Sequence, residues 1–435
     1  MTAAATLPTD LDALNIKLKG IRRQLRDHYL AADTRPWIIG FSGGKDSTLL
    51  LHLVLEAVRN VAPEDRRRSI YVVSNNTQVE SPVFQDFVDR LLERLEQSLE
   101  GLNVPVRVVR TQPLPEESFW VNLLGKGYPA PNRTFRWCTD RMKIRPTSRF
   151  IRDIVSDNGE AILLLGVRRA ESATRAGSIS RHEDASEGPL SPHSTHKGVW
   201  VFSPIKELTT DEVWMTLLNS RPPWGGSYRE IVTLYKNAAG GECPFVINVD
   251  DAPSCGSSSA RFGCWTCTVV EKDNSLAALI DAGHEHLEPL AEFRDRIKKL
   301  SETPGCRSLV RRNGQPGLGP FTLDARRLLL DELLALNRQM NLPLISDHEV
   351  RLIREQWEKD QTTDVLREIG ARTRCIPKSL SVPKTSCGLN PGSAAVPGRL
   401  PMLPPCGTGP IPAARPDPAD NFGMHGREHH HCKNP

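Results

Sequence analysis

A glycine-containing run near the N-terminus has the composition of an anion site. It consists of Ser42, Gly43, Gly44, Lys45, Asp46 and Ser47. Its glycines let backbone N–H groups approach a phosphate closely, and a helix that starts there adds its positive end. Lys45 adds a charge, and the two serines add hydroxyl donors. Asp46 is unusual in a phosphate cradle and indicates either a Mg²⁺ anchor or a favourable helix-start charge.

Four cysteines with Gly and Pro neighbours indicate an inorganic centre. They follow a C-x11-C-x8-C-x2-C pattern and are Cys243, Cys255, Cys264 and Cys267. Four thiolates suit a tetrahedral Zn²⁺ ion or a [4Fe–4S] cluster, and the spacing leaves both open. The alternative without a metal is a set of buried, unligated thiols.

A basic segment covers residues 133–149, with six Arg and Lys against one acidic residue. Guanidinium groups at this density suit phosphates, so we expect nucleic acid to contact Arg136, Arg141 and Lys143. Phe135 and Trp137 lie between them and can stack on a base. The alternative is a solvated cationic face with Trp137 in the core.

Cys138 lies inside this basic segment. If Arg136 and Arg141 are close in space, they lower the pKa of the thiol, which suits a sulfur-carrying persulfide. A cluster ligand that replaces one of the four cysteines, and a small core residue, are the alternatives. A second basic stretch follows a predicted strand and supplies three further phosphate-binding candidates, Arg168, Arg169 and Arg175.

Alternating short apolar runs and amphipathic stretches must position these residues. Strands are predicted at 37–41, 69–74, 104–109, 160–167 and 199–202, and helices at 10–30, 48–60 and 83–99. This alternation predicts an α/β fold whose parallel sheet is covered on both faces. Ligands of such sheets bind at the carboxyl ends of strands, where residues 42–47 lie.

Composition divides the 435 residues further. Gly, Pro, Ser and Cys dominate from 221 to 267, and helical periodicity returns at 275–300 and 324–370. The last part, with 12 Pro, 7 Gly and one aromatic residue, predicts disorder. The expected domains are an N-terminal helix (1–33), a nucleotide domain (34–220), a Cys-rich region (221–300), a helical region (301–375) and a tail (376–435).

The overall balance is ordinary, with 39% hydrophobic residues and a formal net charge of +4. That charge is too small to identify a nucleic-acid binder by itself. The N-terminus lacks the pattern of a signal peptide, and no apolar run is long enough to span a bilayer. We therefore expect a cytoplasmic protein without membrane contact, whose ten cysteines serve metal or thiol chemistry rather than disulfides.

Residues 42–47 resemble the signature of the PP-loop ATP pyrophosphatases, the adenine nucleotide alpha-hydrolase-like enzymes that split ATP into AMP and pyrophosphate. Sulfur-handling branches of this superfamily thiolate nucleosides or reduce phosphoadenylylsulfate. The reductase-like branch often has Asp-Thr after its second strand. This chain has Asn76 and Thr77 there, so either Glu80 supplies the missing acid or it is a solvated helix-start charge.

A longer series of motifs resembles the DNA phosphorothioation sulfurtransferase family, DndC, between about residues 35 and 360. The motifs lie at 119–123, 127–131, 135–139, 166–175, 241–244, 253–256 and 261–270. The resemblance implies ATP and Mg²⁺ at residues 42–47, with Lys45 and Asp46 catalytic, and a [4Fe–4S] cluster on the four cysteines. It also implies DNA as substrate, a cysteine desulfurase as sulfur donor, and other subunits of a phosphorothioation complex.

The function expected from these features is adenylation of a DNA backbone phosphate, followed by replacement of a non-bridging oxygen by sulfur. Cys138 is the candidate sulfur carrier. A sulfonucleotide reductase or a tRNA thiolase on the same core is the second enzymatic interpretation. A zinc-stabilised DNA-binding subunit is the interpretation without catalysis.

Overall fold

The computed structural model describes residues 7–171, 176–177, 179–181, 188–238 and 262–374. Within these ranges the strands form one six-stranded sheet in the order β3-β2-β1-β4-β6-β5. The strands are β1 (Trp37–Phe41), β2 (Ile70–Asn75), β3 (Val106–Thr111), β4 (Ala161–Leu164), β5 (Leu190–Pro192) and β6 (Val199–Phe202). All neighbouring strands run parallel except β5, which pairs antiparallel with β6 at the edge.

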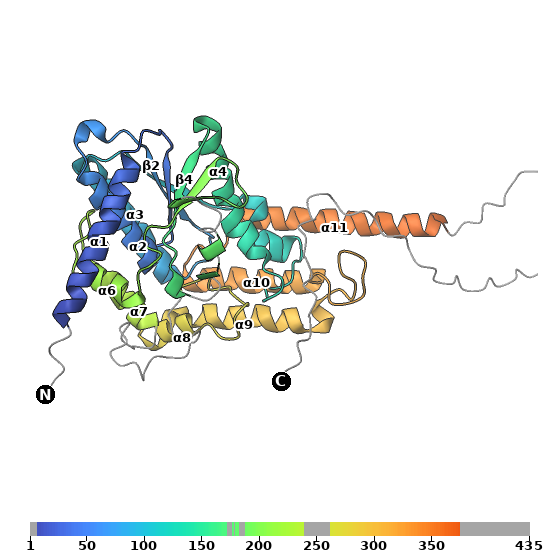
Figure 1. Ribbon diagram of the computed structural model, residues 1–435. Helices are drawn as coiled ribbons and strands as arrows, with labels where there is room; N and C mark the ends of the chain where they lie inside the picture. Colours follow the sequence, from blue (N-terminus) through green and yellow to red (C-terminus); the bar gives the residue numbers. More distant parts are fainter. Residues whose placement is uncertain (1–6, 172–175, 178, 182–187, 239–261, 375–435) are drawn as a thin grey trace, which may run out of the picture.

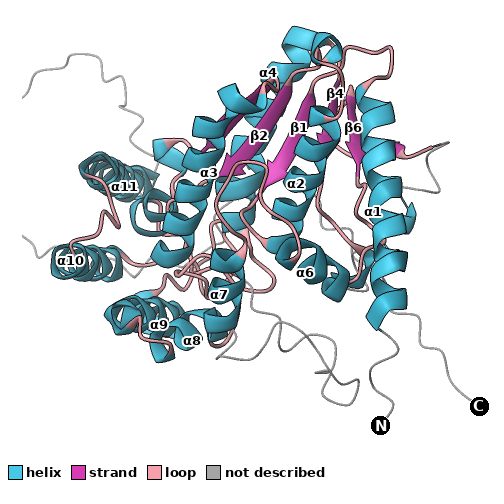
Figure 2. Cartoon of the chain, turned by 90° about the vertical axis from the view of Figure 1, so that its left-hand side faces the viewer, coloured by secondary structure: helices cyan, strands magenta, loops and turns pink. Residues whose placement is uncertain are grey.

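Helices cover both faces of the sheet. They are α1 (Leu7–Tyr29), α2 (Lys45–Arg59), α3 (Pro82–Leu102) and α4 (Arg145–Asn158). Two further helices, α6 (Thr210–Leu218) and α7 (Arg229–Ala238), lie beyond one end of the sheet (Figure 2). Side chains of α1, α2 and α3 form one core with alternate residues of β1, whereas Ile38 packs with Ile151 and Ile154 of α4 on the other face. Figure 2 shows the sheet between these layers. Burial on both faces explains why β1 is apolar throughout.

The C-terminal helices lie beside the sheet rather than over it (Figure 1). They are α8 (Asn274–Asp281), α9 (Glu288–Glu302), α10 (Leu323–Met340) and α11 (Asp347–Arg374). The indole N–H of Trp120 donates to the Leu344 carbonyl at 2.7 Å, and that of Trp357 donates to the Leu124 carbonyl at 2.7 Å. These bonds fasten the helical part to the segment after β3. Within the described residues, no helix combines the length and apolar character needed to cross a bilayer.

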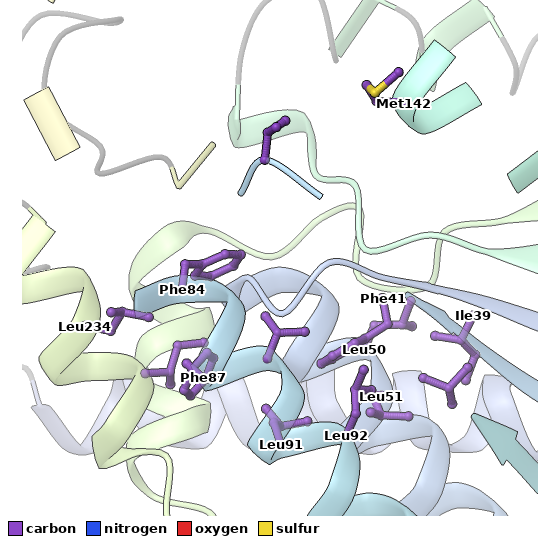
Figure 3. Packing of buried hydrophobic residues seen from close by; sticks show 14 of the residues in the cluster. Ile39, Phe41, Leu50, Leu51, Phe84, Phe87, Leu91, Leu92, Met142 and Leu234 are labelled. Atoms are coloured by element: carbon purple, nitrogen blue, oxygen red, sulfur yellow. The ribbon is translucent and has the colours of Figure 1, made fainter. Parts of the chain in front are cut away.

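We refer to residues 42–47 as the phosphate loop. The core below this loop is built mainly from α2, α3 and α7. Figure 3 shows Phe84 and Phe87 of α3 beside Leu234 of α7, with Leu50 of α2 next to Phe41 at the end of β1. Gly43 has φ of +73°, and a Cβ there would lie 2.3 Å from Val88 of α3. The loop is therefore held against α3 in a conformation that favours glycine.

The predicted α/β fold is confirmed, with two corrections. The sheet is mixed because β5, which the sequence pattern did not predict, adds an antiparallel edge strand. The helical pattern at 324–370 is two helices, since Asn341 adopts the left-handed conformation and Pro343 follows. The predicted disordered tail lies outside the described residues.

Candidate functional site

The phosphate loop lies at the point where the chain order of the sheet reverses. β1 is flanked by β2 on one side and β4 on the other, and both pairs are parallel. The loop follows β1, and the segment that begins at Leu165 follows β4, so the two meet at the carboxyl ends of adjacent strands. Crevices at such reversals are the usual ligand sites of open α/β sheets.

Hydrogen bonds within the loop fix its shape. The Ser47 hydroxyl donates to the Gly44 carbonyl at 3.0 Å and accepts from the Ser42 N–H at 3.2 Å. The Ser42 and Ser47 hydroxyls lie 3.2 Å apart. The first helical N–H, that of Lys45, donates to the hydroxyl of Tyr235 in α7 at 3.3 Å. Helix α2 thus begins inside the predicted motif, and its N-terminus lies just after the carboxyl end of β1.

Asp46 is clamped between two cations. Arg168 Nε lies 2.7 Å from one carboxylate oxygen and Lys45 Nζ lies 3.1 Å from the other. Arg168 is only 1% exposed and also donates to the Leu208 carbonyl at 3.0 Å. Asp46 therefore serves as a charge in the first turn of α2, one of its two predicted roles. Mg²⁺ at this carboxylate would compete with both cations.

Close packing brings the β4 loop onto the phosphate loop. A Cβ at Gly166 would lie 2.9 Å from the Asp46 carbonyl oxygen and 3.0 Å from the Ser47 nitrogen. Only glycine permits this approach without a backbone shift. Arg169 follows and pairs with Glu207 at 2.9 Å on the surface. Arg175, the third predicted phosphate ligand of this stretch, lies outside the described residues.

The structure brings three thiols together at the neighbouring strand ends. Cys264 and Cys267 form a turn in which the Cys267 N–H donates to the Cys264 carbonyl at 3.0 Å. Cys138 interacts electrostatically with both. We refer to Cys138, Cys264 and Cys267 as the three-thiol group. Cys243 and Cys255, the other two predicted ligands, lie outside the described residues.

The expectation that arginines lower the pKa of Cys138 is wrong. Burial raises the pKa of this thiol, the nearby Cys267 adds to the rise, and the cation that opposes it is Lys143. Arg141 instead pairs with Glu117 at 3.1 Å. Cys138 is thus a protonated thiol at neutral pH unless a metal or another group ionises it.

The donor chemistry of the three-thiol group suits a thiophilic metal. Burial raises the pKa of Cys264 to about 12, and the negative charge of Glu80 adds to this effect. A bound metal would replace the proton on such a thiol. Among the described residues, no three His, Cys, Asp or Glu side chains converge closely enough to hold one ion. The three-thiol group as described is therefore not by itself a metal site, although its thiols have the donor chemistry for one.

Two further residues position the thiols. Arg294 of α9 is 3% exposed and its Nε donates to the Cys267 carbonyl at 2.9 Å. Glu80 forms a β-bridge with Cys264, and its carboxylate lies 3.5 Å from Lys143 Nζ. Glu80 therefore faces the thiols rather than being a solvated charge. Arg294 was not predicted, because it lies 27 residues from its partner.

An aromatic stack connects the phosphate loop to the three-thiol group. The ring of Phe262, two residues before Cys264, stacks on Phe84 at 4.7 Å and meets Tyr235 edge-on at 5.0 Å. Tyr235 in turn accepts the Lys45 N–H. Burial raises the pKa of Tyr235 to about 12, so its hydroxyl stays neutral. The sequence contained no signal for Tyr235, which lies 190 residues from Lys45.

The predicted nucleic-acid contacts differ in how exposed their side chains are. Arg136 is exposed, and the Lys143 side chain is 51% exposed. Arg141 is 18% exposed because it pairs with Glu117. Phe135 is 44% exposed, whereas Trp137 is 6% exposed and stacks on Phe119 at 5.3 Å. Phe135 therefore remains a candidate for base stacking, while Trp137 is a core residue.

Solved structures with a similar chain path include three nucleotide enzymes. Phosphoadenylyl-sulfate reductase from Candida auris is 12% identical over 46% of this chain and 83% of that chain, with a TM-score of 0.28. The U34-tRNA thiolase NcsA from Methanococcus maripaludis, solved with its [4Fe-4S] cluster, is 17% identical over 51% and 73%, with a TM-score of 0.27. FMN adenylyltransferase from Candida glabrata is 10% identical over 52% and 62%, with a TM-score of 0.30.

Sequence comparison identifies the family. An uncharacterized protein of Methanocaldococcus jannaschii is 26% identical over 206 residues, which cover 45% of this chain and 34% of that protein. The chain thus matches about a third of that relative's length. The model of the phosphoadenosine phosphosulfate reductase domain matches residues 36–270, which contain β1 to β6, the phosphate loop and the three-thiol group. The protein belongs to the phosphoadenosine phosphosulfate reductase domain family.

Proposed function

We propose that this protein cleaves ATP to AMP and pyrophosphate and uses the adenylate to replace an oxygen of the DNA backbone by sulfur. The observation that carries the proposal is the short path between the phosphate loop and the three-thiol group. The Lys45 N–H contacts the Tyr235 hydroxyl, and the Tyr235 ring lies 5.0 Å from that of Phe262, two residues before Cys264. A nucleotide activated at one end of this path is close to sulfur chemistry at the other.

The chain's own groups supply most of the activation step. The N-terminus of α2 and the Ser42 and Ser47 hydroxyls stabilise pyrophosphate as its negative charge grows. Lys45 moves from Asp46 to the leaving group, while Arg168 keeps Asp46 neutralised. Asp46 therefore pairs with Lys45 until the nucleotide is bound and does not bind the nucleotide itself. Mg²⁺ bound with ATP would neutralise further phosphate charge.

The proposed reaction consists of three steps: adenylation of the phosphate, attack by sulfur, and reduction of a sulfur–sulfur bond. A non-bridging oxygen of the phosphodiester attacks the α-phosphorus of ATP, and the bond from that phosphorus to pyrophosphate breaks. The terminal sulfur of a protein persulfide then attacks the activated backbone phosphorus, and AMP leaves with the original oxygen. A thiol reductant cleaves the remaining sulfur–sulfur bond, which leaves sulfur on the backbone. The persulfide sulfur comes from a cysteine desulfurase, and a metal centre on the thiols would supply redox or sulfur-carrying chemistry.

The second candidate is reduction of a sulfonucleotide, which the family match favours. That reaction needs a bound sulfonucleotide and a reductant but no cleavage of ATP. A tRNA thiolase would cleave ATP but would place sulfur on a base. The products therefore distinguish the three reactions.

The test incubates the anaerobically purified protein with α-labelled ATP, Mg²⁺, a cysteine desulfurase with cysteine, a thiol reductant and DNA. We expect DNA-dependent release of pyrophosphate and AMP, and phosphorothioate dinucleotides in the digested DNA by mass spectrometry. Lys45→Ala should abolish both, whereas Lys197→Ala, at an exposed lysine between β5 and β6, should retain both. Two parallel incubations replace DNA by phosphoadenylylsulfate or by tRNA: sulfite release without ATP cleavage in the first, or thio-bases in the second, would instead establish one of the alternatives.

A further inference from the structure

Three arginines on one helical face share a single carboxylate. Arg141 lies in a π-helical turn (Thr139–Ile144), and Arg145 and Arg149 follow in α4. Their spacing of four residues places all three on the same side. The carboxylate of Glu117 lies 2.6 Å from Arg145, 3.1 Å from Arg141 and 3.3 Å from Arg149. We call Arg141, Arg145 and Arg149 the arginine row.

The arginine row keeps donors available for another anion. The side chains of Arg145 and Arg149 are 37% and 30% exposed, whereas that of Glu117 is 13% exposed. Each guanidinium has five N–H donors, and Glu117 engages one from each of the three. Asp140 accepts a further hydrogen bond from Arg145 at 2.9 Å. The two carboxylates of Glu117 and Asp140 neutralise two of the three arginine charges, so these five side chains together keep a net positive charge.

Glu117 remains an anion in this environment. Burial alone would raise the pKa of its carboxyl group, but the hydrogen bonds and charges of Arg145 and Arg141 hold that pKa below its usual value. A carboxylate and a phosphodiester both bind guanidinium groups through two oxygens. The carboxylate thus occupies the arginine row as a phosphate would.

The arginine row leads to the three-thiol group. Cys138 precedes the π-helical turn directly, and Arg141 is its third residue. The Asn75 side chain at the end of β2 donates to the Met142 carbonyl at 2.8 Å, which ties this turn to the carboxyl edge of the sheet. A chain of phosphates bound along α4 would therefore arrive beside Cys138.

We propose that the arginine row binds the phosphates of a nucleic-acid backbone. In the free protein, the Glu117 carboxylate occupies the position of a phosphate until the nucleic acid displaces it. This inference rests on the proposed function, because it assumes a nucleic-acid substrate. Glu117 lowers the affinity for any nucleic acid that does not engage all three arginines. It thereby favours continuous backbones over isolated phosphates such as free nucleotides.

The experiment measures binding by fluorescence anisotropy with the full-length protein. The probes are a labelled DNA duplex of mixed sequence, the same single strand, and a tRNA, each titrated at KCl concentrations from about 50 to 200 mM. Glu117→Gln should bind roughly tenfold more tightly than the wild type, because one competing anion is lost. Glu116→Gln is the matched control: it removes the same charge from an exposed neighbour and should change affinity little.

Two arginine variants provide a second measurement that does not depend on Glu117. Arg145→Ala and Arg149→Ala should each reduce the slope of log affinity against log salt by about 0.7–0.9, the contribution of one phosphate contact. Arg152→Ala changes an exposed arginine of the same helix that faces His196, and it should leave the slope unchanged. The probe with the largest gain in Glu117→Gln identifies the backbone.

The outcomes separate this inference from the proposed function. If Glu117→Gln binds no more tightly and Arg145→Ala keeps the wild-type slope, while DNA is still modified, only the arginine-row inference is refuted. If the wild type binds none of the three probes, both are refuted. Tight binding without phosphorothioate formation refutes the proposed reaction alone.

Discussion

Replacement of Arg168 by methionine tests the clamp on which the phosphate loop depends. Methionine keeps much of the buried volume but removes the donors to Asp46, at 2.7 Å, and to the Leu208 carbonyl, at 3.0 Å. Breaking a buried ion pair costs about 3–5 kcal/mol, and an unsatisfied buried acceptor costs about 1–3 kcal/mol. Because Lys45 still neutralises Asp46, we expect a loss of about 3 kcal/mol.

The adjacent arginine provides the control for this substitution. Arg169 is 29% exposed and its partner Glu207 is 63% exposed, so Arg169→Met should cost only about 0.2–1 kcal/mol. Urea unfolding followed by tryptophan fluorescence gives both values. In an Asp46→Asn background the cost of Arg168→Met should fall by about 1–3 kcal/mol, since the partner charge is already gone. Equal costs for the two arginines, or strict additivity with Asp46→Asn, would refute the clamp.

Three further predictions concern packing, pH and metal content. Gly166→Ala places a methyl group 2.9 Å from the Asp46 carbonyl and should lower the free energy of unfolding by about 1–3 kcal/mol and reduce pyrophosphate release. Burial alone would raise the pKa of Glu56, but the neighbouring His52 and Arg22 lower it to about 2 from its usual 4.5. The stability that Glu56 contributes over Glu56→Gln should therefore be complete above pH 4.5 and disappear as the pH falls toward 2. Cys138→Ser should lower the iron or zinc content of anaerobically purified protein.

Each of these has a matched comparison. Gly101→Ala, at a glycine of α3 with open space around it, should not destabilise the protein. A pH-independent difference between wild type and Glu56→Gln would contradict the lowered pKa. Cys306→Ser changes a thiol outside the three-thiol group and should retain the full metal content. Full metal content in Cys138→Ser would favour the carrier or core role for that cysteine.

The local pattern was sufficient to predict most elements near the site. The apolar run at β1 followed by glycines, serines and a charged pair predicted a strand, a tight loop and a helix start, and the structure has each of them. Such features depend on neighbouring residues, so periodicity and turn chemistry reveal them. The short antiparallel β5 was missed because three residues at a sheet edge carry no periodic signal.

The sequence by itself determined the chemical groups of the candidate site: a loop of glycines, serines, Lys45 and Asp46, thiols at metal-like spacing, and a basic segment. Only the tertiary structure decided their partners. In the fold, Arg168 pairs with Asp46, which lies 122 residues away in the sequence, and the Tyr235 hydroxyl accepts the Lys45 N–H. Burial of Cys138 raises the pKa of its thiol. Residue types and spacing specify what a side chain can do, but burial and the charge of distant neighbours determine its ionisation and its availability to a ligand.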